Sequence, residues 1–146
     1  MNQYLQVATG PYQLLLNCAA VHEVLNVNHH DTAFIAGHLD IRNQTYEVLN
    51  SRAILDLEPI LNTTHTGVIY TQNLNTAAFI LLFDRVVGLQ HVSAQQILPL
   101  PNVSKRLSCL FDGVFIDNKL DNKQLIYRLR YPLDNDVLFS SPKQNA

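Results

Sequence analysis

The sequence contains few of the residues that build disulfide-stapled or nucleotide-binding proteins. Its 146 residues include only two cysteines, Cys18 and Cys109, which lie far apart and form no C-x-x-C motif. We interpret them as reduced, packed thiols of a cytoplasmic protein. Glycine occurs only five times, and no glycines have the spacing of a phosphate-binding loop.

Charge and long apolar runs are also scarce. Charged residues make up 15% of the chain and the net charge is −2, so no basic field draws in nucleic acid or an anionic membrane. The longest apolar run, residues 77–83, is too short to span a bilayer, and the first residues do not resemble a secretory signal. Hydrophobic residues nevertheless reach 47%, which argues against disorder. We therefore expect a cytoplasmic globular protein with no inserted segment.

The residues that could support catalysis or bind a metal are poorly placed. Among the six histidines the only cluster is His29-His30-Asp31, in which adjacent side chains on an extended chain point to opposite faces. Cys18 and His22 could act as nucleophile and base, but no glycine-rich or G-x-S-x-G element accompanies them. We therefore expect no metal, no cofactor and no enzymatic activity.

Short apolar segments separated by turn residues recur along the chain. Strands are expected over residues 4–7, 12–17, 33–41, 46–49, 67–72, 77–83, 86–92, 107–116 and 123–130, and a kinked element over 18–27 leads into another. Strands this short, at intervals of about 8–12 residues, are typical of all-β sandwiches and barrels.

Short helical segments interrupt the strands. Asn50 or Ser51 can cap a helix over residues 51–57. Ser93 and Gln96 have the spacing of a capping box, which predicts a single helical turn after them. The chain is therefore expected to be almost entirely β, with short helical turns.

Two polar stretches bear on the domain organisation. Residues 62–66 have little packing power, so we expect them to join two halves of a single domain that covers residues 1–146. The polar tail, residues 134–146, is expected to be partly disordered.

Three short motifs follow one another in the sequence. They consist of Val21, Glu23 and Val24; then Gly37, Ile41 and Arg42; and last Asp84, Val86, Leu89, Ser93, Gln96, Ile97, Pro99 and Pro101. In order and spacing these motifs resemble the CheW-like domain family, and the resemblance covers roughly residues 4–130.

The resemblance implies a fold and a function. Members of the family fold as two small SH3-like, five-stranded β-barrels around a shared core. They are non-catalytic adaptors that join the cytoplasmic tip of a methyl-accepting chemoreceptor to the regulatory domain of a CheA-type histidine kinase, and the receptor binds between the barrels. The receptor-facing positions carried over by motif are Val21, Glu23, Gly37, Arg42, Val86 and Gly88.

Glu23 and Arg42 form the sharpest candidate pair among these positions. Joined by charge-assisted hydrogen bonds, they would offer directional contacts to a partner. The alternative is two independent surface charges that contribute little.

Several positions depart from the family pattern. Asn43 replaces a glycine of the motif, although asparagine also tolerates a left-handed backbone in the hairpin turn expected at residues 42–44. Asn50 replaces an aspartate, and Arg128 or Arg130 stands where an acidic residue is common. These changes indicate a divergent member. Two alternatives within the family remain. The protein could be an accessory of a chemosensory system that controls pili or surface motility, or a member that keeps only one of the two partners.

A nucleic-acid-binding module is the alternative from a different class, since small β-barrels often bind single strands. Lys105 and Arg106, with Arg128 and Arg130, could form a basic strip near Tyr127. The negative net charge and the lack of an aromatic ladder make this function less favoured.

Overall fold

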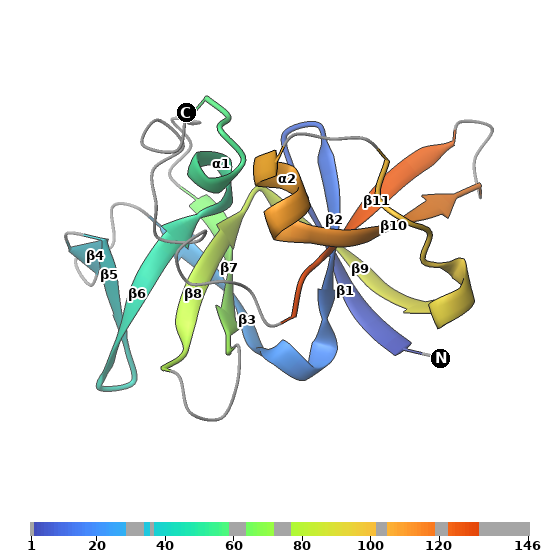
Figure 1. Cartoon of the computed structure of the whole chain (residues 1–146). Coiled ribbons are helices and arrows are strands. Elements are labelled where there is room, and N and C mark those ends of the chain that lie inside the picture. Colours follow the sequence, from blue (N-terminus) through green and yellow to red (C-terminus); the bar gives the residue numbers. More distant parts are fainter. Residues whose placement is uncertain are drawn as a thin grey trace.

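The computed structural model describes residues 2–28, 34–35, 37–58, 64–71, 77–101, 105–118 and 123–131. Short strands dominate this part of the chain, and brief helical turns join some of them (Figure 1). The elements are β1 (Asn2–Thr9), β2 (Tyr12–Asn17), η1 (Cys18–Ala20), β3 (Val21–Asn28), β4 (Phe34–Ile35), β5 (His38–Ile41), β6 (Gln44–Asn50), α1 (Ser51–Ile54), β7 (Thr64–Tyr70), β8 (Phe79–Phe83), β9 (Arg85–Val92), η2 (Ala94–Gln96), α2 (Lys105–Leu110), β10 (Phe111–Asp117) and β11 (Gln124–Leu129). Within the described segments, none of the helices has the length and hydrophobicity that a membrane crossing requires.

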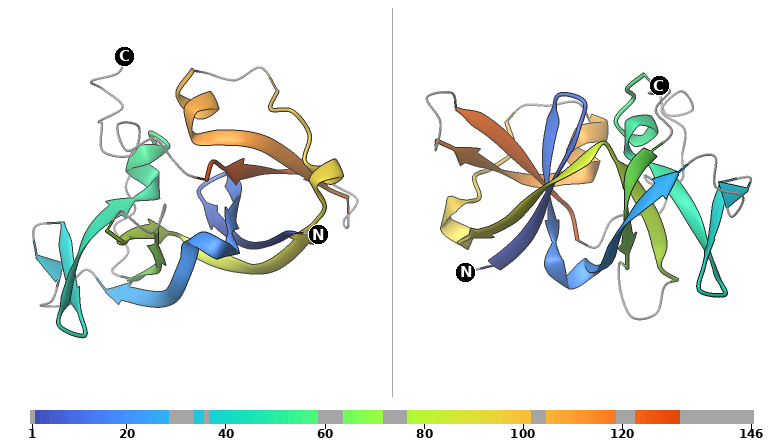
Figure 2. Two further views of the ribbon diagram at one scale, coloured as in Figure 1. Left: turned by 60° about the horizontal axis from the view of Figure 1, so that its bottom comes forward. Right: turned by 180° about the vertical axis from the view of Figure 1, so that it is seen from behind.

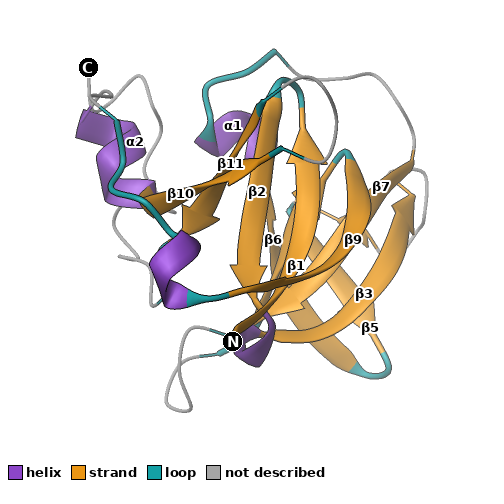
Figure 3. Cartoon of the chain, turned by 90° about the vertical axis from the view of Figure 1, so that its right-hand side faces the viewer, coloured by secondary structure: helices purple, strands orange, loops and turns teal. Residues whose placement is uncertain are grey.

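The strands form two sheets, and each sheet curls into a small barrel (Figures 1 and 3). The first sheet has the order β10-β11-β2-β1-β9, and the second has the order β3-β7-β8-β6-β5-β4. A bridge between Leu98 and Val114 closes the first barrel, with N···O distances of 2.8 and 3.0 Å. The expected all-β fold of two barrel subdomains is thus confirmed, although the second sheet has six strands where five were expected, because the short hairpin strand β4 adds to its edge.

In the described segments the chain passes between the barrels twice, and the expected join at residues 62–66 is wrong. The first crossing follows β2, at η1, and the second lies at Asp84, between β8 and β9. Strand β7 begins at Thr64 and pairs with β3 and β8 inside one sheet. The polar side chains of this stretch suggested a spacer, but β-branched threonines suit a strand, and His65 is buried. The tail at residues 134–146 lies outside the described residues.

Three apolar clusters hold the fold together. The largest lies between the barrels and takes side chains from both sheets, among them Leu14 and Leu16 of one and Leu81 and Phe83 of the other. A second cluster around Ile80 fills the β3–β8 barrel, and a third, which includes Tyr4, Leu15, Val92 and Ile126, fills the other barrel. The large shared cluster ties the two barrels into one unit.

Two expected strands are partly something else. The strand expected over residues 33–41 is replaced by the hairpin of β4 and β5, in which Phe34 pairs with Leu39, because Gly37 turns the chain at φ 80°. The segment 107–116 begins inside helix α2, whose last-turn carbonyl, Ser108 O, accepts hydrogen bonds from Arg130 Nε at 3.1 Å and Nη2 at 2.9 Å. That distant partner has no signature in the local sequence.

Other expectations are confirmed closely. Strand β2 covers residues 12–17, and the kinked element resolves into η1 followed by β3. Asn50 caps α1 through a 3.0 Å hydrogen bond from Arg52 N–H to Asn50 Oδ1, although α1 ends at Ile54 rather than at residue 57.

Candidate protein-binding site

The hairpin between β5 and β6 places Arg42 at an exposed tip. Ile41 pairs with Gln44, so Arg42 and Asn43 form a two-residue turn with φ values of 49° and 66°. Positive φ at both central residues is the pattern of a type I′ turn, whose twist matches that of the flanking strands. The Arg42 side chain is 66% exposed, as expected for a residue at the tip of a hairpin.

Arg42 reaches from this tip to Glu23 on β3. The two side chains meet in a bidentate ion pair, with an Nη1–Oε1 distance of 3.1 Å and a second contact from Nη2 to Oε2. The hydrogen bond that Arg42 donates lowers the pKa of Glu23 below its usual value, and the same bond raises the pKa of Arg42. Since β3 and β5 are not neighbours in the sheet, the pair links the edge strand β3 to the β5–β6 hairpin. It is not two independent charges.

Val21 and Val86 follow the two crossings of the chain. Val21 opens β3 opposite Tyr70, and Val86 lies near the start of β9 opposite Val7. Both valines pack against the shared core cluster and are only partly buried. They therefore lie along the boundary between the barrels.

The two glycines of the expected site lie apart from the ion pair. Gly37 turns the β4–β5 hairpin and its carbonyl accepts a 2.8 Å hydrogen bond from Val48 N–H. Gly88 lies on β9 opposite Gln6. A Cβ atom added at either glycine would meet no atom within 4 Å, so close packing does not require glycine there. The structure thus gathers the six expected residues into an ion pair, a pair of boundary valines and two separate glycines.

Three exposed apolar residues were not expected at the site. Val24 on β3 is 43% exposed, and Val87 and Leu89 on β9 are 43% and 59% exposed. Each strand is the last in its sheet, and both lie on the same side of the molecule (Figure 2, right). Along β9 exposed and less exposed residues alternate in the structure, but the sequence gives no matching signal, because Val86 and Val87 are both apolar and adjacent. We call Val24, Val87 and Leu89 the edge-strand surface.

A polar cluster at the second crossing links the two barrels through hydrogen bonds to Asp84. Asp84 accepts hydrogen bonds from Arg52 Nε at 3.0 Å, Arg52 Nη2 at 2.6 Å and Gly10 N–H at 2.8 Å. The Thr9 and Ser51 hydroxyls lie 2.8 Å apart beside it. Burial raises the pKa of Asp84, but the hydrogen bonds from Arg52 and Gly10 and the Arg52 charge outweigh it, so the pKa lies below its usual value. Because Gly10 and Arg52 belong to different barrels, the cluster joins them.

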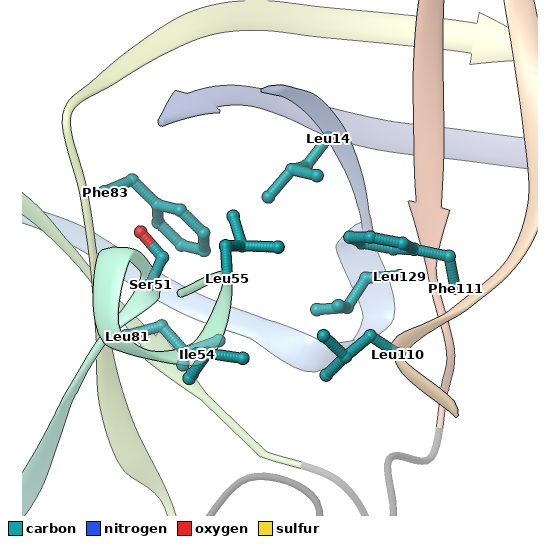
Figure 4. Close-up of a pocket in the computed structure, with 9 residues that line it drawn as sticks. All are labelled: Leu14, Ser51, Ile54, Leu55, Leu81, Phe83, Leu110, Phe111 and Leu129. Carbon is teal, nitrogen blue, oxygen red and sulfur yellow. The ribbon is translucent and has the colours of Figure 1, made fainter. Parts of the chain in front are cut away.

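The shared core contains a small cavity under α1 and α2 (Figure 4). Its volume is about 20 Å³, enough for a single water molecule. The lining side chains come from both barrels and are apolar except for Ser51: Leu14, Ser51, Ile54, Leu55, Leu81, Phe83, Leu110, Phe111 and Leu129. A cavity of this size is a packing gap and not a ligand site.

The described residues offer little for metal binding or nucleophilic catalysis. Within the segments that the structure describes, no three His, Cys, Asp or Glu side chains group as metal ligands, and the cluster at residues 29–31 lies outside those segments. Burial raises the pKa of the Cys18 thiol, which disfavours the reactive thiolate.

Comparison with known proteins identifies the family. The family model described as the CheW-like domain matches residues 3–130. The fold is similar to that in the crystal structure of scaffolding protein TtCheW from Thermoanaerobacter tengcongensis, with a TM-score of 0.70 and 16% identity over 95% of this chain and 93% of that chain. No curated protein matches the sequence. Because the family model covers most of its length, the chain belongs to the CheW-like domain family.

Proposed function

We propose that this protein is a non-catalytic, cytoplasmic adaptor of bacterial chemosensory signalling. It joins the cytoplasmic tip of a methyl-accepting chemoreceptor to the regulatory domain of a CheA-type histidine kinase. The observation that carries the proposal is the family match over residues 3–130, which spans both barrels and both crossings of the chain. An adaptor needs two separate surfaces held rigidly with respect to each other, and two barrels around one core provide them.

The receptor contact combines the edge-strand surface with the residues of the expected site. Leu89, at 59% exposure, and its neighbour Val87 offer apolar area that is removed from water when a partner covers it. The ion pair of Glu23 and Arg42 adds directional hydrogen bonds at an exposed position. Val21 and Val86 shape the boundary between these groups, and we assign Gly37 and Gly88 to its periphery.

Within this function, two kinds of pathway are open. The protein could serve a flagellar chemotaxis system or, as a divergent member, one that controls pili or surface motility. The departures at Asn43 and Asn50 bear on which partner is recognised, since the fold tolerates both.

Nucleic-acid binding gains no support from Arg128 in β11 or from Arg130, which follows this strand. Arg128 Nε donates to Asp112 Oδ1 at 2.6 Å, and Arg130 donates to the Ser108 carbonyl. The charge of Asp112 offsets that of Arg128, and Arg130 is held at a backbone carbonyl, so the two arginines make a weak basic strip for a phosphate backbone.

Affinity capture from the source cell tests the proposed function. The tagged chain is expected to recover a histidine kinase, a methyl-accepting receptor or both, and the pathway of the recovered kinase identifies the system served. A Leu89→Asp variant is the matched control, because it places a charge on the edge-strand surface and should lose the receptor while keeping the kinase. Recovery of neither partner by the native chain would overturn the proposal.

A further inference from the structure

A second, polar cavity opens at one end of the barrel formed by β1, β2, β9, β10 and β11. Its volume is about 200 Å³, large enough for a small polar ligand rather than a single water molecule. It is lined by Asn2, Tyr4, Asn17, Asp112, Arg128, Leu129 and Tyr131. The lining includes no residue of the expected binding site and none of the edge-strand surface, so the cavity is separate from both.

The sheet register brings the polar groups of this cavity together. Tyr4 of β1 pairs with Asn17 of β2, so their side chains share one face of the sheet. On β10 the register with β11 shifts between Phe111 and Gly113, which leaves Asp112 at an irregularity of the kind that re-aims a side chain.

Hydrogen-bond donors are in excess in this cavity. Arg128 Nε donates to Asp112 Oδ1 at 2.6 Å, and Arg128 Nη1 lies 3.4 Å from the Tyr4 hydroxyl, so these bonds engage only part of the five N–H donors of a guanidinium. Asn17 Oδ1 accepts a 3.0 Å hydrogen bond from Ala19 N–H, which leaves the Asn17 amide NH₂ as the group that can serve a ligand. The Asp112 carboxylate is committed to Arg128.

We propose that this cavity binds a carboxylate group. The ligand oxygens would accept hydrogen bonds from Arg128 Nη2 and the Asn17 NH₂, and one would accept from the Tyr4 hydroxyl. Arginine supplies the parallel N–H groups that recognise carboxylates, and a neighbouring amide and phenol complete a donor set for one such group. The carboxylate belongs either to a small organic acid or to an acidic side chain of a protein partner. The inference does not depend on the adaptor function.

Titration followed by NMR tests the proposal, with sodium acetate as the probe and sodium chloride at equal ionic strength as the reference. Acetate is expected to cause saturable shifts of the Arg128 side-chain and Asn17 amide signals. Asp112→Asn should tighten acetate binding by about two- to fivefold, because it removes a partly exposed negative charge that repels acetate and frees Arg128 from its ion pair. Arg128→Gln should abolish the saturable shifts. Arg85→Gln, which makes the same charge change at the far end of β9, should not alter them.

Two further probes separate the sources of the carboxylate. Succinate represents a small organic acid, and a capped peptide with one central glutamate represents a protein side chain, with the glutamine peptide as its control. Tighter binding of succinate supports the first source, and tighter binding of the glutamate peptide supports the second. Shifts that chloride reproduces, or an Asp112→Asn variant that binds acetate no better, would overturn the proposal. If the Arg128→Gln variant does not fold, the tighter acetate binding expected for Asp112→Asn still tests the proposal.

Discussion

At the scale of a single residue, a substitution at Arg42 should weaken receptor binding without lowering the stability of the fold. Its side chain is 66% exposed and its partner Glu23 is 39% exposed, so Arg42→Ala should leave the melting temperature almost unchanged. If Arg42 is a receptor contact, the same change should weaken receptor binding by about 5- to 150-fold, the range for an anchoring interface arginine. Kinase binding should persist. A large fall in Tm with unchanged receptor affinity would show that Arg42 is structural.

Glu23 should respond together with Arg42. Glu23→Ala is expected to weaken receptor binding as Arg42→Ala does, and the double variant should be less than additive, because each single change already removes the pair. The pKa of Glu23 is lowered mainly by the hydrogen bond from Arg42. The ion pair is therefore fully formed at and above the usual pKa of glutamate, and it is lost only when the pH falls through the lowered value. Receptor affinities of the four proteins, measured at neutral and acidic pH, check this. Strict additivity would contradict it.

At the scale of the element, the β5–β6 hairpin can be improved. Asn43 adopts φ 66° in the second central position of the turn, where type I′ turns favour glycine. Asn43→Gly should therefore raise the free energy of unfolding, by up to about 1 kcal/mol, because a left-handed backbone strains a residue that has a Cβ atom. Urea denaturation measures the change. Asn50→Ala is the opposite control, since it removes the α1 cap and should cost about 1 kcal/mol. Destabilisation by Asn43→Gly would mean that the asparagine side chain stabilises the turn.

Elements with a local signal could be predicted from the sequence, and those set by distant partners could not. The short apolar run of β2 and the cap at Asn50 depend on neighbouring residues, so both were predicted correctly. Helix α2 was missed, because its last-turn carbonyl is bound by Arg130, a residue far along the chain that follows β11. The break at Gly37 was missed, because the apolar residues around it read as one continuous strand.

The candidate site was predictable only as far as the family motifs reach. The motifs indicated Glu23 and Arg42, which the structure joins in an ion pair. They did not indicate Val87 or Leu89 as exposed, since the sequence gives no matching alternation there and does not say that β9 ends its sheet. The polar cavity beside Arg128 was not predictable either, because it depends on the register irregularity at Asp112.

At the scale of the whole molecule, Asp84 should act as the clamp between the barrels. Its carboxylate accepts from Arg52 and Gly10, which lie in different barrels, and Asp84→Asn should lower the free energy of unfolding by about 1–3 kcal/mol. Because the folded-state pKa is lowered, this contribution is complete above the unfolded value of about 3.9 and is lost as the pH falls through the folded value. The difference between native and variant protein should thus shrink below about pH 4. A difference that stays constant in acid would contradict the clamp.

The central claim is that this molecule bridges two partners, and sedimentation of the kinase with receptor-bearing membranes tests it most directly. The CheA-type kinase and receptor membranes from the source organism are mixed, and the adaptor is titrated in. The account predicts that kinase in the pellet rises with added adaptor, that Leu89→Asp abolishes the rise, and that Arg85→Gln does not. Kinase that pellets equally with and without the native adaptor would contradict the account.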